Sequence, residues 1–154
     1  MWAESSPGEG STFHIELPVL PEATPVRANP TTNGGGQVTG RRILVVDDEP
    51  EVRDILLRAL SADGHDVALA PDGESAWKLI QENQFDVIFL DLRMPGIDGQ
   101  ELHQLVSEFS PDLARKIVFI TGDTANSDTR KFLDSTPCPV LSKPFTIEAV
   151  RSLL

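Results

Sequence analysis

The sequence predicts an α/β fold, in which a parallel sheet is covered on both faces by helices, and three observations indicate it. From residue 41 onward, short apolar runs alternate with stretches of helical periodicity, which is the pattern of repeated βαβ units. The apolar runs are rich in β-branched and aromatic residues, as expected of strands that are buried on both faces. Several of these runs also lead into a charged or hydroxyl-bearing residue, where open α/β sheets place their ligands.

Five strands are expected in this region, each a short apolar run bounded by turn residues. The central run precedes Asp91, and Met94-Pro95-Gly96 then directs the chain away from any regular element. The run that follows Asp63-Gly64 is less apolar than the others. In chain order, the expected strands cover residues 43–46, 66–70, 87–90, 117–120 and 140–141.

The helices expected between these strands are marked by apolar residues three and four positions apart. The first follows Pro50 and the second opens at Asp72, whereas Ser110-Pro111 ends the third, because proline interrupts a helix. A fourth, between Thr124 and Ser135, has the weakest pattern, since it is almost entirely polar. The last begins at Thr146 and breaks off at the end of the chain, which predicts a truncated helix.

The composition limits the classes of partner and compartment. The chain has 154 residues and a formal net charge of −11, which disfavours nucleic acid and anionic membranes as partners, because phosphate-rich surfaces bind basic proteins. A single cysteine, Cys138, excludes an internal disulfide and fits a reducing compartment. No apolar run approaches transmembrane length, and the start lacks the layout of a signal peptide. We therefore expect a cytoplasmic protein with no membrane contact by this segment.

Residues 1–18 have a different character. Phe13, Ile15 and Leu17 alternate with polar residues, which predicts a half-buried strand. The preceding Gly8–Thr12 stretch predicts a turn whose backbone amides could wrap a phosphate. This segment is similar to the end of the ATP-binding domain of sensor histidine kinases. We interpret it as a severed remnant that does not bind ATP, because the helices and the metal-binding asparagine of such a domain are missing.

Residues 19–40 are rich in Pro, Thr, Asn and Gly, and they predict a flexible linker. Such a composition cannot bury enough apolar surface to order itself. A flexible coil of about 22 residues spans roughly 25 Å. The remaining residues, 41–154, are enough to form one domain with its own core.

Polar side chains at the ends of four expected strands carry the candidate chemistry. Asp47-Asp48 follows the first strand, Asp91 the third and Thr121 the fourth, and Lys143 lies just beyond the fifth. Right-handed crossovers bring these ends to one edge of the sheet, where three carboxylates would face one ammonium. Oxygen-only ligands with open water positions favour Mg²⁺ as the ion that balances the remaining charge.

The order and spacing of DD, D, T and KPF resemble the receiver domain of two-component response regulators over residues 41–154. The resemblance implies a flavodoxin-like, doubly wound parallel sheet of five strands in the order 2-1-3-4-5. It also implies that the acidic end of the central strand takes a phosphoryl group from a histidine kinase or a histidine phosphotransfer protein. With the kinase remnant and the linker, the layout is that of a hybrid histidine kinase.

The resemblance assigns roles residue by residue. Asp91 is the implied phosphoacceptor, and Thr121 and Lys143 are the implied pair that grips the phosphoryl group. The implied Mg²⁺ site draws on Asp47 through water, Asp48, Asp91 and the backbone carbonyl of Arg93. These roles predict a receiver that is phosphorylated on its own aspartate rather than a turnover enzyme.

Two alternatives remain open, and two residues depart from the common receiver pattern. A phosphatase of the haloacid-dehalogenase type also uses a strand-end Asp and Mg²⁺, but it carries a second Asp where this chain has Arg93. The other alternative is a receiver-like interaction module that is never phosphorylated. Arg93 places a long cation at the rim of the pocket, and Val140 stands where many receivers carry an aromatic residue that turns inward on phosphorylation.

Overall fold

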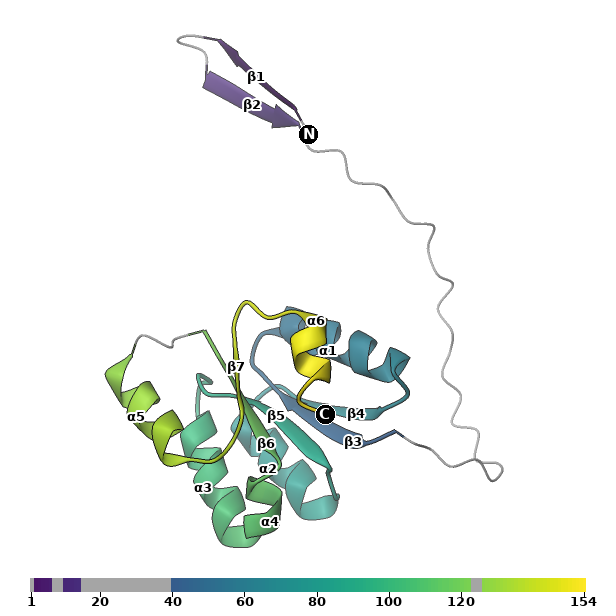
Figure 1. Ribbon diagram of the computed structural model, residues 1–154, viewed down its shortest axis with the longest axis vertical. Helices are drawn as coiled ribbons and strands as arrows, with labels where there is room; N and C mark the ends of the chain where they lie inside the picture. Colours follow the sequence, from purple (N-terminus) through teal and green to yellow (C-terminus); the bar gives the residue numbers. More distant parts are fainter. Residues whose placement is uncertain (1, 7–9, 15–39, 123–125) are drawn as a thin grey trace. The chain divides into compact units, whose positions relative to one another are not determined.

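The computed structural model describes residues 2–6, 10–14, 40–122 and 126–154 of the chain (Figure 1). The chain divides into two units, residues 1–35 and 36–154, and each is described by itself.

The described part of the first unit is an antiparallel hairpin of β1 (Trp2–Ser6) and β2 (Gly10–His14). The predicted turn through Gly8–Thr12 is wrong over its second half, because Gly10–Thr12 pairs with β1. Strand β1 was not predicted, since its residues do not alternate between apolar and polar and only the pairing reveals it. The rest of the predicted strand and nearly all of the predicted linker lie outside the described residues.

The second unit is built on a five-stranded sheet in which every pairing is parallel. The strand order is β4-β3-β5-β6-β7, which is 2-1-3-4-5 when the strands of this unit are numbered alone. This order confirms the predicted flavodoxin-like α/β fold. The strands are β3 (Arg42–Val46), β4 (Asp66–Ala70), β5 (Val87–Asp91), β6 (Ile117–Thr121) and β7 (Val140–Ser142).

Helices connect these strands and cover both faces of the sheet (Figure 1). They are α1 (Pro50–Ala62), α2 (Gly73–Glu82), α3 (Gly99–Phe109), α4 (Pro111–Ala114), α5 (Ser127–Ser135) and α6 (Ile147–Arg151). The sequence did not predict α4. Ser110 ends α3 as expected, but its side chain also caps α4 by accepting a hydrogen bond from the Leu113 N–H at 3.4 Å. Proline fits the first position of the new helix, because no hydrogen bond is lost there.

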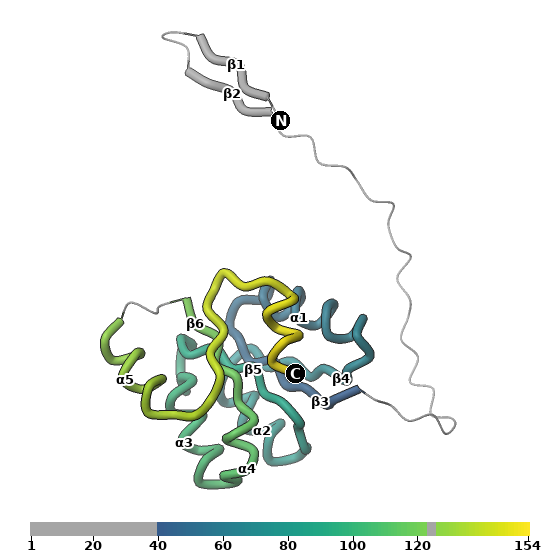
Figure 2. Tube along the Cα trace, viewed as in Figure 1, coloured from purple at the N-terminus to yellow at the C-terminus, as the bar shows by residue number. Residues whose placement is uncertain are grey.

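Each face of the sheet packs against its own set of helices, as the tube in Figure 2 also shows. Leu44 and Leu90 belong to the layer formed with α2, α3 and α4, and residues of α5 pack at its margin. Val45 and Phe89 point into the opposite layer, which contains buried residues of α1 and Val150 of α6. Burying a side chain of this size stabilises the fold by about 1.5–3 kcal/mol. Because both faces are covered, the central strands are continuously apolar, as predicted.

The parallel register places the candidate residues at one edge of the sheet. Asp91 lies opposite Ile120, and Thr121 lies opposite Ser142, so the carboxyl ends of neighbouring strands are level. The start of α3 also approaches this edge closely. A Cβ atom at Gly99 would lie 2.4 Å from the backbone carbonyl oxygen of Asp91, so only glycine fits there.

Candidate functional site

Asp91 ends β5 and is almost fully buried, with 4% of its surface exposed. Its Oδ1 accepts a hydrogen bond from the backbone N–H of Arg93 at 3.1 Å, and its Oδ2 accepts one from Nζ of Lys143 at 2.7 Å. The chain then turns away at Gly96, whose φ of 78° is a left-handed conformation that glycine favours. The carboxylate is therefore held in one orientation at the sheet edge.

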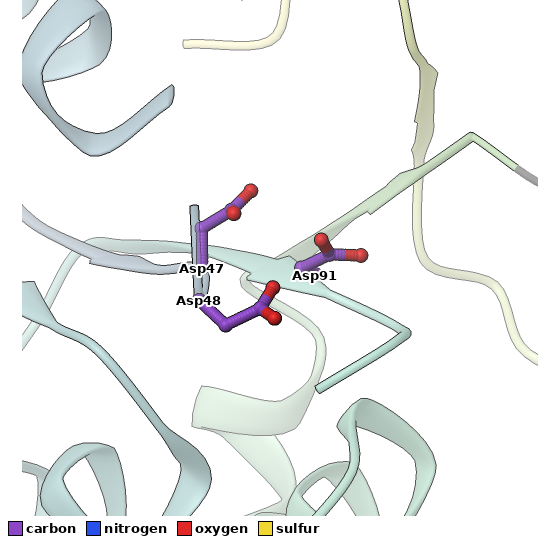
Figure 3. A group of neighbouring side chains, drawn as sticks. All are labelled: Asp47, Asp48 and Asp91. Carbon is purple, nitrogen blue, oxygen red and sulfur yellow. The ribbon is translucent and has the colours of Figure 1, made fainter. Parts of the chain in front are cut away.

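Asp47 and Asp48 follow β3, and their side chains differ in burial: Asp47 is fully buried and Asp48 is exposed. The Asp47 Oδ1 accepts a hydrogen bond from the backbone N–H of Glu49 at 2.9 Å. The guanidinium of Arg53 in α1 donates to the backbone carbonyl of Asp47 and so ties the helix to the strand end. Each aspartate, with Asp91, offers a carboxylate oxygen, and these oxygens lie within 4.8 Å of one another (Figure 3).

Lys143 reaches this cluster from the segment after β7. Its backbone N–H donates to the Thr121 carbonyl at 2.7 Å, and its peptide bond to Pro144 is cis, which the sequence did not reveal. Its Nζ lies 3.0 Å from Asp47 Oδ2, in an ion pair without hydrogen-bond geometry. Burial by itself lowers the pKa of Lys143, but the hydrogen bonds to Asp91 and Glu49, together with the contact with Asp47, outweigh burial and raise the pKa above its usual value. Lys143 therefore remains a cation.

Glu49 is a further contact of Lys143 that the sequence did not predict. Its Oε1 accepts a hydrogen bond from Nζ at 2.8 Å, although 57% of the glutamate side chain is exposed. This hydrogen bond lowers the pKa of the Glu49 carboxyl. In the sequence, the only sign of this contact is that Glu49 is a third acid directly after Asp47-Asp48. That sign is ambiguous, because an acid before Pro50 is equally expected at the start of a helix.

The electrostatics of the site are those of several carboxylates around one ammonium. Burial raises the pKa of Asp47; the contact with the Lys143 ammonium and the hydrogen bond from the Glu49 N–H oppose this rise, and repulsion by Asp91 adds to it. At 4.8 Å, two unit negative charges repel by about 1 kcal/mol in water and about 3 kcal/mol at an effective dielectric near 20. A divalent cation with oxygen ligands would balance this charge.

Two further predicted site residues, Thr121 and Arg93, lie at the end of β6 and just after the end of β5, at the same edge of the sheet as the cluster. Thr121 is fully buried at the end of β6. Gly122 follows it, and a Cβ atom there would be 3.8 Å from the Lys143 Cβ, so this side of the cluster is not crowded. Arg93 is exposed, and its Nη2 lies 3.5 Å from Oγ1 of Thr129 on α5.

Trp77, Cys138 and Val140 lie away from the cluster. The Trp77 ring packs edge-on against Phe109, with 5.5 Å between the ring centroids, which indicates a structural role. Cys138 is buried, and its Sγ lies 3.8 Å from Nε2 of His103. Val140 is 38% exposed on the edge strand β7. Among the described residues, no helix is both long enough and apolar enough to cross a membrane.

Sequence comparisons agree with this geometry. Residues 43–154 match the family model of the response regulator receiver domain. The response regulator receiver protein CpdR of Brucella abortus is 40% identical over 108 residues, which are 68% of this chain and 86% of that protein. The response regulator MprA of Mycobacterium sp. (strain KMS) is 40% identical over 107 residues, which are 70% of this chain but 46% of that protein. The chain thus spans about half the length of the second relative.

Solved structures show the same fold. The chemotaxis response regulator CheY4 of Vibrio cholerae matches with a TM-score of 0.66 and 27% identity, over 75% of this chain and 100% of that one. The response regulator protein TrrA of Thermotoga maritima, solved in complex with Mg²⁺-BeF, matches with a TM-score of 0.62 and 35% identity, over 74% of this chain and 99% of that one. This chain therefore belongs to the family of response regulator receiver domains of two-component systems.

Proposed function

We propose that this chain accepts a phosphoryl group on Asp91 from the phosphohistidine of a histidine kinase or a histidine phosphotransfer protein. The observation that carries the proposal is the contact of Asp91 Oδ2 with the Lys143 ammonium at 2.7 Å, beside two further aspartates at the same sheet edge. An oriented carboxylate next to a fixed cation is suited to attack an anionic phosphoryl group.

The proposed step forms one bond and breaks one. A carboxylate oxygen of Asp91 attacks phosphorus in line, and the P–N bond to the donor imidazole breaks, with its electron pair going to the ring nitrogen. That nitrogen takes up a proton, and Asp91 becomes an acyl phosphate. The transition state is loose and highly charged, so positioning and charge stabilisation supply most of the rate. The ammonium of Lys143 meets one phosphoryl oxygen, and the hydroxyl of Thr121 donates to another.

The donor set at the sheet edge fits Mg²⁺. All three clustered side chains offer oxygen, and their spacing of 4.8 Å or less allows two of them to share one small ion. When bound, the ion would neutralise negative charge on the phosphoryl oxygens. The residues proposed to hold it are Asp48 and Asp91 directly, Asp47 through water, and Arg93 through its backbone carbonyl. The Mg²⁺-BeF complex of TrrA supports this assignment by similarity.

We also propose that the receiver belongs to a hybrid histidine kinase in the cytoplasm. In this layout, residues 1–18 are a remnant of the ATP-binding domain, 19–40 are a linker, and 41–154 are the receiver. The family match begins at residue 43, which leaves the earlier residues to another role. The net charge of −11 favours a protein partner over nucleic acid.

Intact-mass analysis after incubation with acetyl phosphate and Mg²⁺ tests the proposal. The parent protein is expected to gain the mass of one phosphoryl group, and Asp91→Asn none, because the amide keeps the shape but is not a nucleophile. Asp134→Asn, the same change at an exposed position of α5, is the matched control and is expected to label like the parent. Labelling of Asp91→Asn would refute the assignment. A parent that never labels would favour the unphosphorylated interaction module.

A further inference from the structure

The Lys143 ammonium contacts three carboxylates that differ in burial. Its Nζ lies 2.7 Å from Asp91 Oδ2, 2.8 Å from Glu49 Oε1 and 3.0 Å from Asp47 Oδ2. The Asp91 and Asp47 side chains are 6% and 0% exposed, whereas that of Glu49 is 57% exposed. Glu49 is therefore the only one of these three partners that water can solvate once it is released.

Helix α1 does not use the Glu49 side chain, although Glu49 is its N-cap residue. The side chain makes no capping hydrogen bond, and Pro50 occupies the first helical position. The Glu49 backbone is nevertheless fixed, because its N–H donates to Asp47 Oδ1 and its carbonyl accepts from the Arg53 N–H at 3.3 Å. From this anchored backbone, the side chain crosses to a lysine 94 positions away in the sequence. A role in the pocket accounts for this orientation, and helix capping does not.

We propose that Glu49 is a positioning residue that holds the Lys143 ammonium in the resting pocket and restrains the reaction with an anionic phosphodonor. The inference rests on the proposed phosphorylation of Asp91. In the proposed reaction, a phosphoryl oxygen must accept a hydrogen bond from the same Lys143 ammonium. Asp91 carries the incoming group and Asp47 is buried, so the contact that breaks is the one between Lys143 and the exposed Glu49. Its charge also repels a donor that approaches the open side of the pocket.

The variant Glu49→Gln tests this role because it keeps the length of the side chain and removes its charge. In the reaction used, Asp91 attacks the phosphorus of acetyl phosphate, and acetate leaves with the electron pair of the P–O bond. At low salt and with Mg²⁺ present, Glu49→Gln is expected to raise the second-order rate constant for labelling by about three- to tenfold. The gain is expected to appear mainly as a lower half-saturating donor concentration, and to shrink as NaCl is added.

Glu51→Gln is the matched control, since Glu51 is an exposed glutamate in the first turn of the same helix. A second readout does not require phosphorylation. Acetylation by limiting acetic anhydride, followed by mass spectrometry, reports the reactivity of Lys143 relative to the exposed Lys78 and Lys131 in the same sample. Loss of the Glu49 carboxylate is expected to raise the relative reactivity of Lys143 about twofold or more, because one negative partner of the ammonium is gone.

Faster labelling and a more reactive Lys143 in Glu49→Gln, with a parent-like Glu51→Gln, support the inference. Equal behaviour of the two variants in both readouts overturns it. So does slower labelling of Glu49→Gln, which would mean that Glu49 assists the reaction. If none of the proteins labels but Lys143 becomes more reactive in Glu49→Gln, the proposed function fails while the hold of Glu49 on Lys143 is supported.

Discussion

Replacing Asp48 by asparagine separates the two consequences of the acidic cluster, namely repulsion without metal and affinity for Mg²⁺. Asp48 is exposed and its oxygen lies within 4.8 Å of those of Asp47 and Asp91, so the repulsion that it feels is near the aqueous limit of about 1 kcal/mol per neighbour. Because Lys143 offsets part of this repulsion, we expect Asp48→Asn to stabilise the metal-free protein by about 1 kcal/mol. For a domain of this size, that corresponds to a rise in Tm of about 4 °C.

Mg²⁺ is expected to reverse the order of stability. An ion that binds only the folded pocket stabilises the parent by RT ln(1 + [Mg²⁺]/Kd), or about 2.7 kcal/mol at a hundredfold excess over Kd. Asp48→Asn loses a proposed direct ligand and is expected to gain much less. The variant is thus the more stable protein in EDTA and the less stable one in excess Mg²⁺.

Urea and thermal unfolding of both proteins, each in EDTA and in excess Mg²⁺, measure this reversal. Asp134→Asn controls for the loss of one acid from a chain with a net charge of −11, and it should respond to Mg²⁺ as the parent does. The reasoning is refuted if Mg²⁺ does not stabilise the parent, or if Asp48→Asn gains as much as the parent.

Three further outcomes are expected. Lys143→Arg should lower acetyl phosphate labelling about tenfold without unfolding the protein, because a planar guanidinium replaces a compact ammonium; equal labelling rates would contradict this. A chain that begins at Gly40 should keep the parent's Tm and labelling, and a large fall in Tm would show that the earlier residues stabilise the receiver. Burial lowers the pKa of His103 in the folded protein below its usual value of about 6.5. The neutral imidazole therefore contributes to the free energy of unfolding above pH about 6.5, and this contribution should be lost as the pH falls through the lower pKa of the folded state. In urea unfolding, His103→Gln should make the free energy of unfolding fall less steeply with decreasing pH, and the same pH dependence in parent and variant would contradict this.

The fold class could be predicted because the strands are buried on both faces. A strand between two helical layers must be apolar on both faces, so it appears in the sequence as a run of consecutive apolar residues, as in Val87–Leu90 and Ile117–Ile120. Element boundaries were less predictable where two signals coincide. Ser110-Pro111 serves both as the end of α3 and as the start of α4, and a sequence pattern does not distinguish one use from two.

Most of the candidate site could also be predicted. In a parallel sheet with right-handed crossovers, residues that follow different strands must meet at one edge. Asp47, Asp48, Asp91, Thr121 and Lys143 were expected there, and the structure brings them to that edge. The prediction required the direction of the strands, which the alternating strand and helix pattern implies, and their order, which the resemblance to receiver domains implies. The proposed roles of these residues await the labelling and metal experiments.

The sequence by itself determined the α/β class, the position of each core strand and the edge where the polar residues gather, because all of these follow from periodicities within a few residues. Only the tertiary structure decided how the charges within that edge are paired. The contact between Glu49 and Lys143 joins residues 94 positions apart, and it depends on how far α1 and the segment after β7 approach each other. That approach is set by side-chain packing across the whole layer, so no local pattern encodes it.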